Sequence, residues 1–167
     1  DVDEKRDLRW SMAVVSDDGK QVVAATRAAD NEDRWFVLVS ADGTSKILDH
    51  IHDEAWVRDP SYMGWLPDNR RFWFGAEQDG WAHLYTVDVT AETPAAKAVT
   101  TGKWEVSDAD LSPDRTRFYI SSTEVHAGER HLYTVSVDGG ARTKLSSRTG
   151  ATGGVAAPDP GARGGPA

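Results

Sequence analysis

Three segments of the chain repeat one pattern at a fixed interval, and this repeat constrains the fold more than any other feature. Residues 33–43 read DRWFVLVSADG, residues 81–88 read WAHLYTVD, and residues 129–140 read ERHLYTVSVDGG. Aligning them places Trp35, His83 and His131 in register, 48 residues apart, and each is expected at the start of a strand. A period of about 40–50 residues is typical of a β-propeller or a solenoid.

Acidic turn sequences recur on nearly the same interval. Pro fixes φ in a tight turn and Asp or Asn side chains bond the nearby backbone, so each of these sequences predicts a hairpin turn. An apolar, strand-like run follows the first three, at residues 21–25, 71–74 and 117–121. The four turn sequences are Ser16–Gly19, Leu66–Asn69, Leu111–Arg115 and Ala157–Asp159.

One repeat therefore contains four antiparallel strands, which is the make-up of a propeller blade. No stretch shows the three-to-four spacing of apolar residues that a helix requires. We predict an all-β fold, a partial β-propeller of about three four-stranded antiparallel blades, at residues 8–60, 61–105 and 106–148. Residues 149–167, rich in Gly, Pro and Ala, are predicted to be a disordered tail. Because about four to eight blades are needed to close a ring, we expect the chain to be part of a longer propeller.

Composition excludes several classes of function. The 27 acidic and 19 basic residues give a formal net charge of −8, which argues against a nucleic-acid partner. The chain has no cysteine, so disulfides, thiolate nucleophiles and cysteine-based zinc sites are ruled out. No apolar run approaches the roughly 20 residues of a membrane span, and membrane insertion is not predicted.

Four segments carry a resemblance to a known family. Asp79–Tyr85, Thr100–Val106, Phe118–Ser121 and Glu129–Tyr133 resemble, in order and spacing, the propeller domain of dipeptidyl peptidase IV. The most specific of them is the Thr-x-Gly-x-Trp-Glu-Val sequence at residues 100–106. The resemblance implies a serine peptidase of the prolyl oligopeptidase family, in which an N-terminal propeller admits short or unstructured peptides to a C-terminal α/β-hydrolase domain.

The resemblance also implies partners and a location. The partners would be a peptide substrate and the hydrolase domain, with a homodimer of the longer protein left open. The location would be periplasmic or extracellular, and the residues alone leave the compartment unknown.

Catalytic machinery is not predicted within these residues. The nucleophile of an α/β-hydrolase lies in Gly-x-Ser-x-Gly, and the nearest sequence, Gly43–Ile47, lacks the second glycine. None of the five histidines has a nucleophile at a recognisable spacing. The family's amine-binding motif, Asp-Trp-x-Tyr-Glu-Glu, is not found, since Asp53-Glu54-Ala55-Trp56 has a different order. We therefore predict no catalytic residue, no cofactor and no metal, and whether the longer protein releases dipeptides stays open.

A few residues remain as candidates for a site. The resemblance makes Arg58, in Trp56-Val57-Arg58-Asp59-Pro60-Ser61, the equivalent of an arginine that the family's propeller directs at the substrate. A guanidinium there would donate charge-assisted hydrogen bonds to a carbonyl or carboxylate. The alternative is a surface ion pair with Asp59 or Glu54.

Other polar and aromatic residues have structural interpretations that we favour. His50, His52, Asp53 and Glu54 are the densest group of potential metal ligands, but a solvated connection between blades explains them better. His83 and His131 recur once per repeat, which favours a structural role. Trp65, Trp73, Trp81 and Trp104 are expected to pack between blades rather than to bind a ligand.

Two alternatives to a peptidase propeller stay open. Acidic turns at this spacing fit a stand-alone, protein-binding propeller scaffold equally well. The second alternative is that the chain is a truncated product without a function in isolation.

Overall fold

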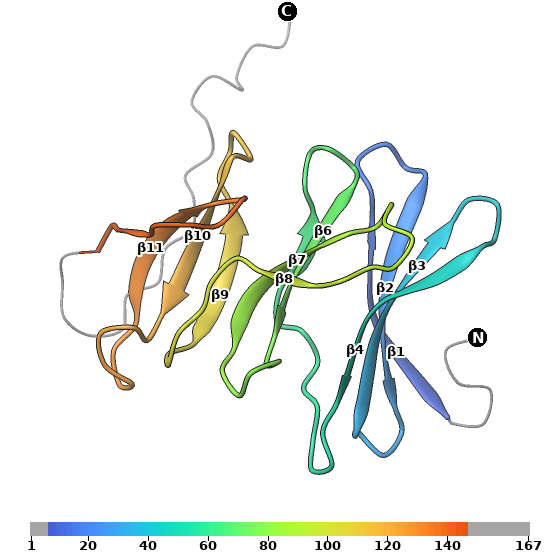
Figure 1. The fold of residues 1–167 in the computed structure, drawn as a ribbon, viewed down its shortest axis with the longest axis horizontal. Helices are drawn as coiled ribbons and strands as arrows, with labels where there is room; N and C mark the ends of the chain where they lie inside the picture. The colour runs from blue at the N-terminus through green and yellow to red at the C-terminus, as the bar shows by residue number, and fades with distance from the viewer. Residues whose placement is uncertain (1–6, 147–167) are drawn as a thin grey trace, which may run out of the picture. The chain divides into compact units, whose positions relative to one another are not determined.

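A computed structural model describes residues 7–146, and every regular element in that range is a strand. The twelve strands form three four-stranded antiparallel sheets, in each of which neighbouring strands are consecutive in the chain (Figure 1). The chain divides into two compact units, with the boundary between Val99 and Thr100. The first unit contains two of the sheets and the second unit contains the third.

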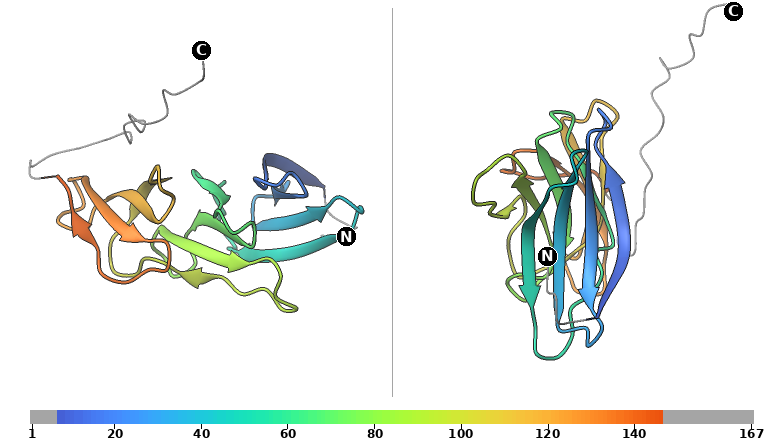
Figure 2. Two further views of the ribbon diagram at one scale, coloured as in Figure 1. Left: turned by 90° about the horizontal axis from the view of Figure 1, so that it is seen from above. Right: turned by 90° about the vertical axis from the view of Figure 1, so that its right-hand side faces the viewer.

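The first sheet has four strands of equal length, which lie side by side in chain order in the right-hand view of Figure 2. The sheet consists of β1 (Leu8–Val15), β2 (Gln21–Ala28), β3 (Asp33–Ser40) and β4 (Ser45–His52). Its side chains alternate between two faces, as the pleat of a strand requires. Phe36 and Leu38 are buried on one face, while Trp35 and Val37 belong to the other.

The strands of the second and third sheets are shorter than those of the first. The second consists of β5 (Met63–Trp65), β6 (Arg71–Ala76), β7 (His83–Asp88) and β8 (Lys97–Ala98). The third consists of β9 (Val106–Leu111), β10 (Arg117–Ser122), β11 (His131–Ser136) and β12 (Thr143–Lys144).

The predicted acidic turns join the first two strands of each sheet. Asp18 accepts hydrogen bonds from the hydroxyl of Ser16 at 2.7 Å and from the Lys20 amide at 3.1 Å, and Asp114 repeats this with Ser112 at 2.6 Å. One residue of each turn has a left-handed backbone: Gly19 (φ 71°), Asn69 (φ 50°) and Arg115 (φ 58°). The fourth predicted turn, Ala157–Asp159, lies outside the described residues.

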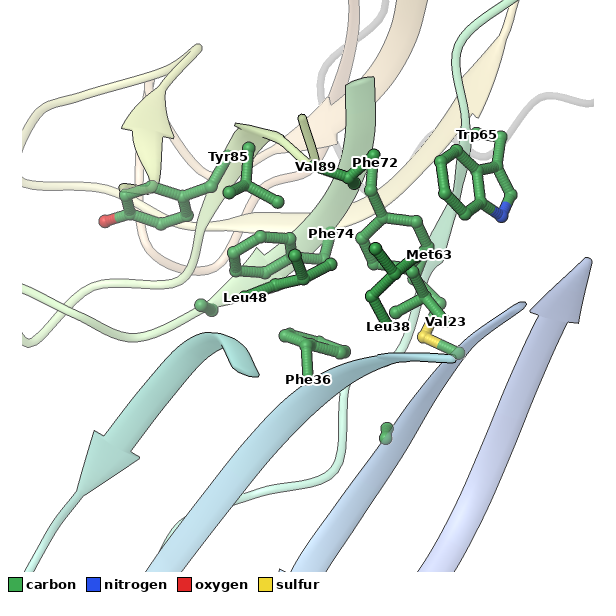
Figure 3. Close-up of a cluster of buried hydrophobic side chains, with 13 residues drawn as sticks. Val23, Phe36, Leu38, Leu48, Met63, Trp65, Phe72, Phe74, Tyr85 and Val89 are labelled. Carbon is green, nitrogen blue, oxygen red and sulfur yellow. The ribbon is translucent and has the colours of Figure 1, made fainter. Parts of the chain in front are cut away.

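One apolar core joins the two sheets of the first unit. Phe36 of β3 lies between Phe72 and Phe74 of β6, with ring centroids 5.7 and 4.5 Å away, and Figure 3 shows side chains of the two sheets pointing toward each other. The indole Nε1 of Trp65 also donates to the Val14 carbonyl at 3.0 Å, so a hydrogen bond links the two sheets. The buried members of this core are Val23, Ala25, Phe36, Leu38, Leu48, Met63, Trp65, Phe72, Phe74, Ala76, Tyr85, Val87 and Val89.

The all-β prediction is confirmed, as is the number of four-stranded sheets. The sheets fall within the predicted residue ranges 8–60, 61–105 and 106–148, whose exact limits stay a prediction. His83 and His131 are the first residues of β7 and β11, whereas Trp35 is the third residue of β3, because pairing extends back to Arg34 with β2 and to Asp33 with β4. The predicted disordered tail, residues 149–167, lies outside the described residues.

Candidate substrate-contact site

The candidate Arg58 lies in the connection between the two sheets of the first unit, which runs past the end of β4 before it returns to β5 (Figure 1). The connection opens with a turn closed by Asp53, whose Oδ1 accepts the amides of Ala55 at 2.7 Å and Trp56 at 3.2 Å. These two donors lower the pKa of Asp53. Local hydrogen bonding of this kind fixes the backbone without a regular element.

The next residues of the connection are held by the first sheet. The Val57 amide donates to the Asn31 carbonyl at 2.8 Å, and the Val57 side chain is buried. Arg34 of β3 donates from Nη1 to the Arg58 carbonyl at 3.0 Å. Arg27 of β2 donates from Nη1 to the Val57 carbonyl at 3.5 Å. The backbone at Arg58 is therefore tied to both central strands of the sheet.

The side chain of Arg58 is open to solvent. It is 78% exposed, and its Nη1 lies 3.8 Å from Oε1 of Glu77, which is itself 47% exposed. Among the described residues the ion pair is thus with Glu77 and not with the predicted Asp59 or Glu54. A pair this open and this long contributes little energy, so the guanidinium can exchange Glu77 for another acceptor.

An aromatic side chain lies two residues before Arg58. Trp56 is 56% exposed, and the guanidinium carbon of Arg27 lies 5.4 Å from its ring centroid. Arg27 also lies 3.6 Å from the Asp59 carboxylate. The connection therefore displays an aromatic surface and a cation on one short, anchored segment.

Two predicted candidates, His50 and His52, belong to β4 rather than to a solvated connection. The strand pairing explains the correction. Leu48 lies at a register shift and is buried in the core, and beyond it Ile51 packs toward the core. His50 and His52 pair with Trp35 and Asp33 and face the other way. Both histidines meet Oδ1 of the buried Asp33, at 2.7 and 3.0 Å. Within residues 7–146, no group of three or more such side chains is arranged to hold a metal ion.

The repeated histidines are buried where their strands begin. His83 has no exposed surface, and His131 contacts the Ser146 hydroxyl at 3.2 Å and the Glu129 carboxylate at 3.0 Å. These contacts use both ring nitrogens of His131 and hold the start of β11 in place.

Comparisons with known proteins decide the family. Residues 2–160 match the family model described as the dipeptidyl peptidase IV (DPP IV) N-terminal region. The chain belongs to this family. Its sequence is 34% identical over 137 residues to a Neosartorya fischeri protein named for dipeptidyl peptidase 4, covering 80% of this chain and 16% of the relative. An Aspergillus fumigatus protein of the same name is 37% identical over 107 residues, covering 62% of this chain and 13% of the relative.

Structural comparison finds the same fold within a solved protein. A Bacteroides ovatus protein solved under the name dipeptidyl aminopeptidase IV aligns with a TM-score of 0.69 and 18% identity, covering 81% of this chain and 22% of that chain. The predicted partial propeller is thereby confirmed. The chain spans less than a fifth of the length of the two fungal relatives.

The most specific segment of the DPP IV resemblance, residues 100–106, has a structural explanation. Trp104 is only 8% exposed, and its indole lies against Gly102, where a Cβ would come within 2.1 Å of Nε1. The guanidinium of Arg142 covers the same ring at 4.3 Å and is held by Glu124 at 2.6 Å. This tryptophan is packed rather than displayed, as are Trp65 and Trp73, whereas Trp81 is 38% exposed.

Sequence reasoning missed the two arginines that hold the connection. Arg34 lies on the same face of β3 as Phe36 and Leu38, so its side chain faces the apolar core. A cation at an inward position of an alternating strand is the signal that would have identified it.

Within residues 7–146 no helix has the length and hydropathy needed to cross a bilayer.

Proposed function

We propose that this DPP IV N-terminal region forms part of a peptidase propeller that admits and positions peptide substrate for an α/β-hydrolase domain of the same protein. The observation that supports the proposal is the placement of Arg58. Its backbone is fixed by Arg34 and its side chain is 78% exposed, with only an open pair to Glu77. A guanidinium held this way can donate two parallel hydrogen bonds to a peptide carbonyl or carboxylate.

The exposed ring of Trp56 adds apolar contact area beside this donor. Trp and Arg are the residue types that most often dominate a binding surface, because each combines a large apolar body with a directional polar group. A peptide lying across the connection would meet both types of contact within three residues of the chain.

Kinetics of the complete gene product on a chromogenic dipeptide substrate test the proposal. We expect Arg58→Gln to raise KM by about tenfold or more with kcat within about twofold, because a lost charged hydrogen bond is worth about 1.5–3 kcal/mol. Arg70→Gln is the matched control, since Arg70 is a similarly exposed arginine of the same unit, paired with Asp88 at the opposite end of β6. An unchanged KM in Arg58→Gln would contradict the proposed role of Arg58.

A protein-binding scaffold is the second candidate, and one surface favours it. The face of the first sheet opposite Phe36 carries several exposed apolar side chains, namely Trp10, Val15, Val39 and Ile47, which are 58, 55, 36 and 42% exposed. Such a face suits contact with further protein. Labelling of the complete gene product by a serine-directed fluorophosphonate favours the peptidase, and failure to label, together with capture of a stoichiometric protein partner, favours the scaffold.

A further inference from the structure

Two arginines lie directly opposite each other in the first sheet. Arg27 of β2 is paired in register with Arg34 of β3, so both side chains project from the same face. Like charges in this position repel each other, and here both are largely withdrawn from water. Arg34 is 3% exposed, and the side chain of Arg27 is 15% exposed.

The contacts of this pair converge on one segment of four residues, Trp56–Asp59. Arg27 lies over the Trp56 ring and beside the Asp59 carboxylate, and it donates to the Val57 carbonyl. Arg34 donates to the Arg58 carbonyl at 3.0 Å. Each residue of the segment therefore contacts one of the two guanidinium groups, although the segment belongs to no strand.

Stability alone does not explain two buried guanidinium groups. Burial lowers the pKa of Arg34, and the nearby carboxylates of Asp49, Asp59 and Glu77 oppose this. Nε of both arginines and Nη2 of Arg34 find no acceptor among the described residues. Apolar residues of similar volume often stabilise such positions more, and buried charges serve in some proteins to select one conformation.

We infer that Arg27 and Arg34 are positioning residues that hold the backbone of Trp56–Asp59 in one conformation. The segment is then already ordered when a peptide meets the side chains of Trp56 and Arg58. The value of this arrangement for binding rests on the proposed function of Arg58. Ordering the segment before binding removes an entropic cost that a mobile loop would pay on each encounter. The holding of the segment itself depends only on the contacts of the two arginines.

Hydrogen exchange and kinetics on the complete gene product test the two parts separately. We expect Arg34→Gln to raise amide exchange in residues 56–59 about tenfold while the amides of β6 and β7 stay protected. In the same variant KM for the dipeptide substrate should rise severalfold, with kcat within about twofold. Arg34→Lys keeps the positive charge and can still donate a hydrogen bond, but it lacks the planar guanidinium, so it should restore part of both values.

Arg27→Gln is the second variant, because it removes a less buried charge and leaves the fold intact if Arg34→Gln does not. Arg70→Gln is the control for loss of an arginine elsewhere in the unit and should change neither value. We call Arg27→Gln and Arg34→Gln the clamp variants. Unchanged amide exchange at residues 56–59 in both of them overturns the inference, whatever Arg58→Gln does.

The remaining outcomes separate the inference from the proposed function. If exchange rises in the clamp variants but neither they nor Arg58→Gln change KM, the positioning of the segment is supported and the proposed function fails. If Arg58→Gln raises KM and the clamp variants loosen the segment without affecting KM, the ordering is irrelevant to binding and the inference is wrong.

Discussion

Trp56 and Trp104 occupy the same place in the repeat, 48 residues apart, yet one is exposed and the other is buried. Each lies between the last strand of one sheet and the first strand of the next. Each also has an arginine over its ring, Arg27 at 5.4 Å and Arg142 at 4.3 Å. The shared position and the shared arginine therefore do not decide whether the ring is buried.

The surroundings of the two rings account for the difference. Trp104 fits against Gly102, a position with no side chain, and Arg142 above it is fixed by Glu124. At Trp56 the equivalent place, two residues before the ring, is taken by Glu54, and Arg27 is bonded to the backbone and to Asp59 instead. Trp104 therefore packs within its own sheet region, whereas Trp56 stays exposed and available for contact.

The largest effect is expected from Trp104→Ala. Removing a buried indole should lower the free energy of unfolding by about 3–5 kcal/mol, because apolar contact is lost and a cavity is left. Urea denaturation followed by far-UV circular dichroism measures it. A loss below about 1 kcal/mol would show that Trp104 is not a packed residue in solution and would remove the contrast with Trp56.

The sequence was sufficient to predict the strands and the turns. Alternating apolar residues and acidic turns at a fixed interval depend on local physics, so strands around Phe72 and Phe118 could be predicted without the fold. The Thr-x-Gly-x-Trp-Glu-Val segment identified the family, and its geometry then explained why Gly102 precedes Trp104 by two residues.

The exposure of residues in the connections could not be predicted in the same way. Outside strands there is no alternation from which to judge which side chains point inward, so Trp56 and Trp104 look alike in the sequence. The role of Arg34 depends on a carbonyl 24 residues later in the chain, and such a pairing has no local signal. His50 and His52 are expected in a connection, yet they pair with Trp35 and Asp33 of β3, a partnership that the local sequence does not reveal.

Gly102→Ala tests whether close approach of the backbone is what allows Trp104 to be buried. The new Cβ would lie 2.1 Å from Nε1 of Trp104, and φ of 140° is unfavourable for any side chain. We expect a loss of about 2–4 kcal/mol by urea denaturation, from strain and overpacking together.

Gly140→Ala is the matched control for Gly102→Ala in the same unit. Gly140 also has a positive φ, of 100°, but a Cβ there meets nothing within 4 Å. It should therefore show only the backbone strain, about 1 kcal/mol. Equal losses in the two variants would show that contact with Trp104 contributes nothing.

A smaller effect on stability is expected from Asp49, whose carboxylate interacts with Arg34. Burial raises the pKa of Asp49, although Arg34, the amide of Gln78 and His50 oppose this. Between the ordinary and the raised pKa the folded state binds more protons than the unfolded state, so this group makes stability fall as pH rises through that window. Asp49→Asn removes the group, so the stability of this variant should fall less than that of the wild type as pH rises above about 4.

Urea midpoints measured every half pH unit for both proteins give the Asp49 contribution as a difference, which cancels the other carboxylates. Parallel curves would mean that Asp49 is not buried beside Arg34 in solution. Asp88→Asn is a useful counterpart, because Arg70 and Thr90 lower the pKa of Asp88 and its contribution has the opposite sign.

The smallest effect on stability is expected from Trp56→Ala. An indole that is 56% exposed loses little on truncation, and its contact with Arg27 is worth about 0.5–1 kcal/mol at an exposed site. Urea denaturation should therefore show a loss of no more than about 1 kcal/mol. A loss as large as that of Trp104→Ala would mean that both tryptophans are packing residues, and Arg27 and Arg34 would then hold a structural element rather than a displayed one.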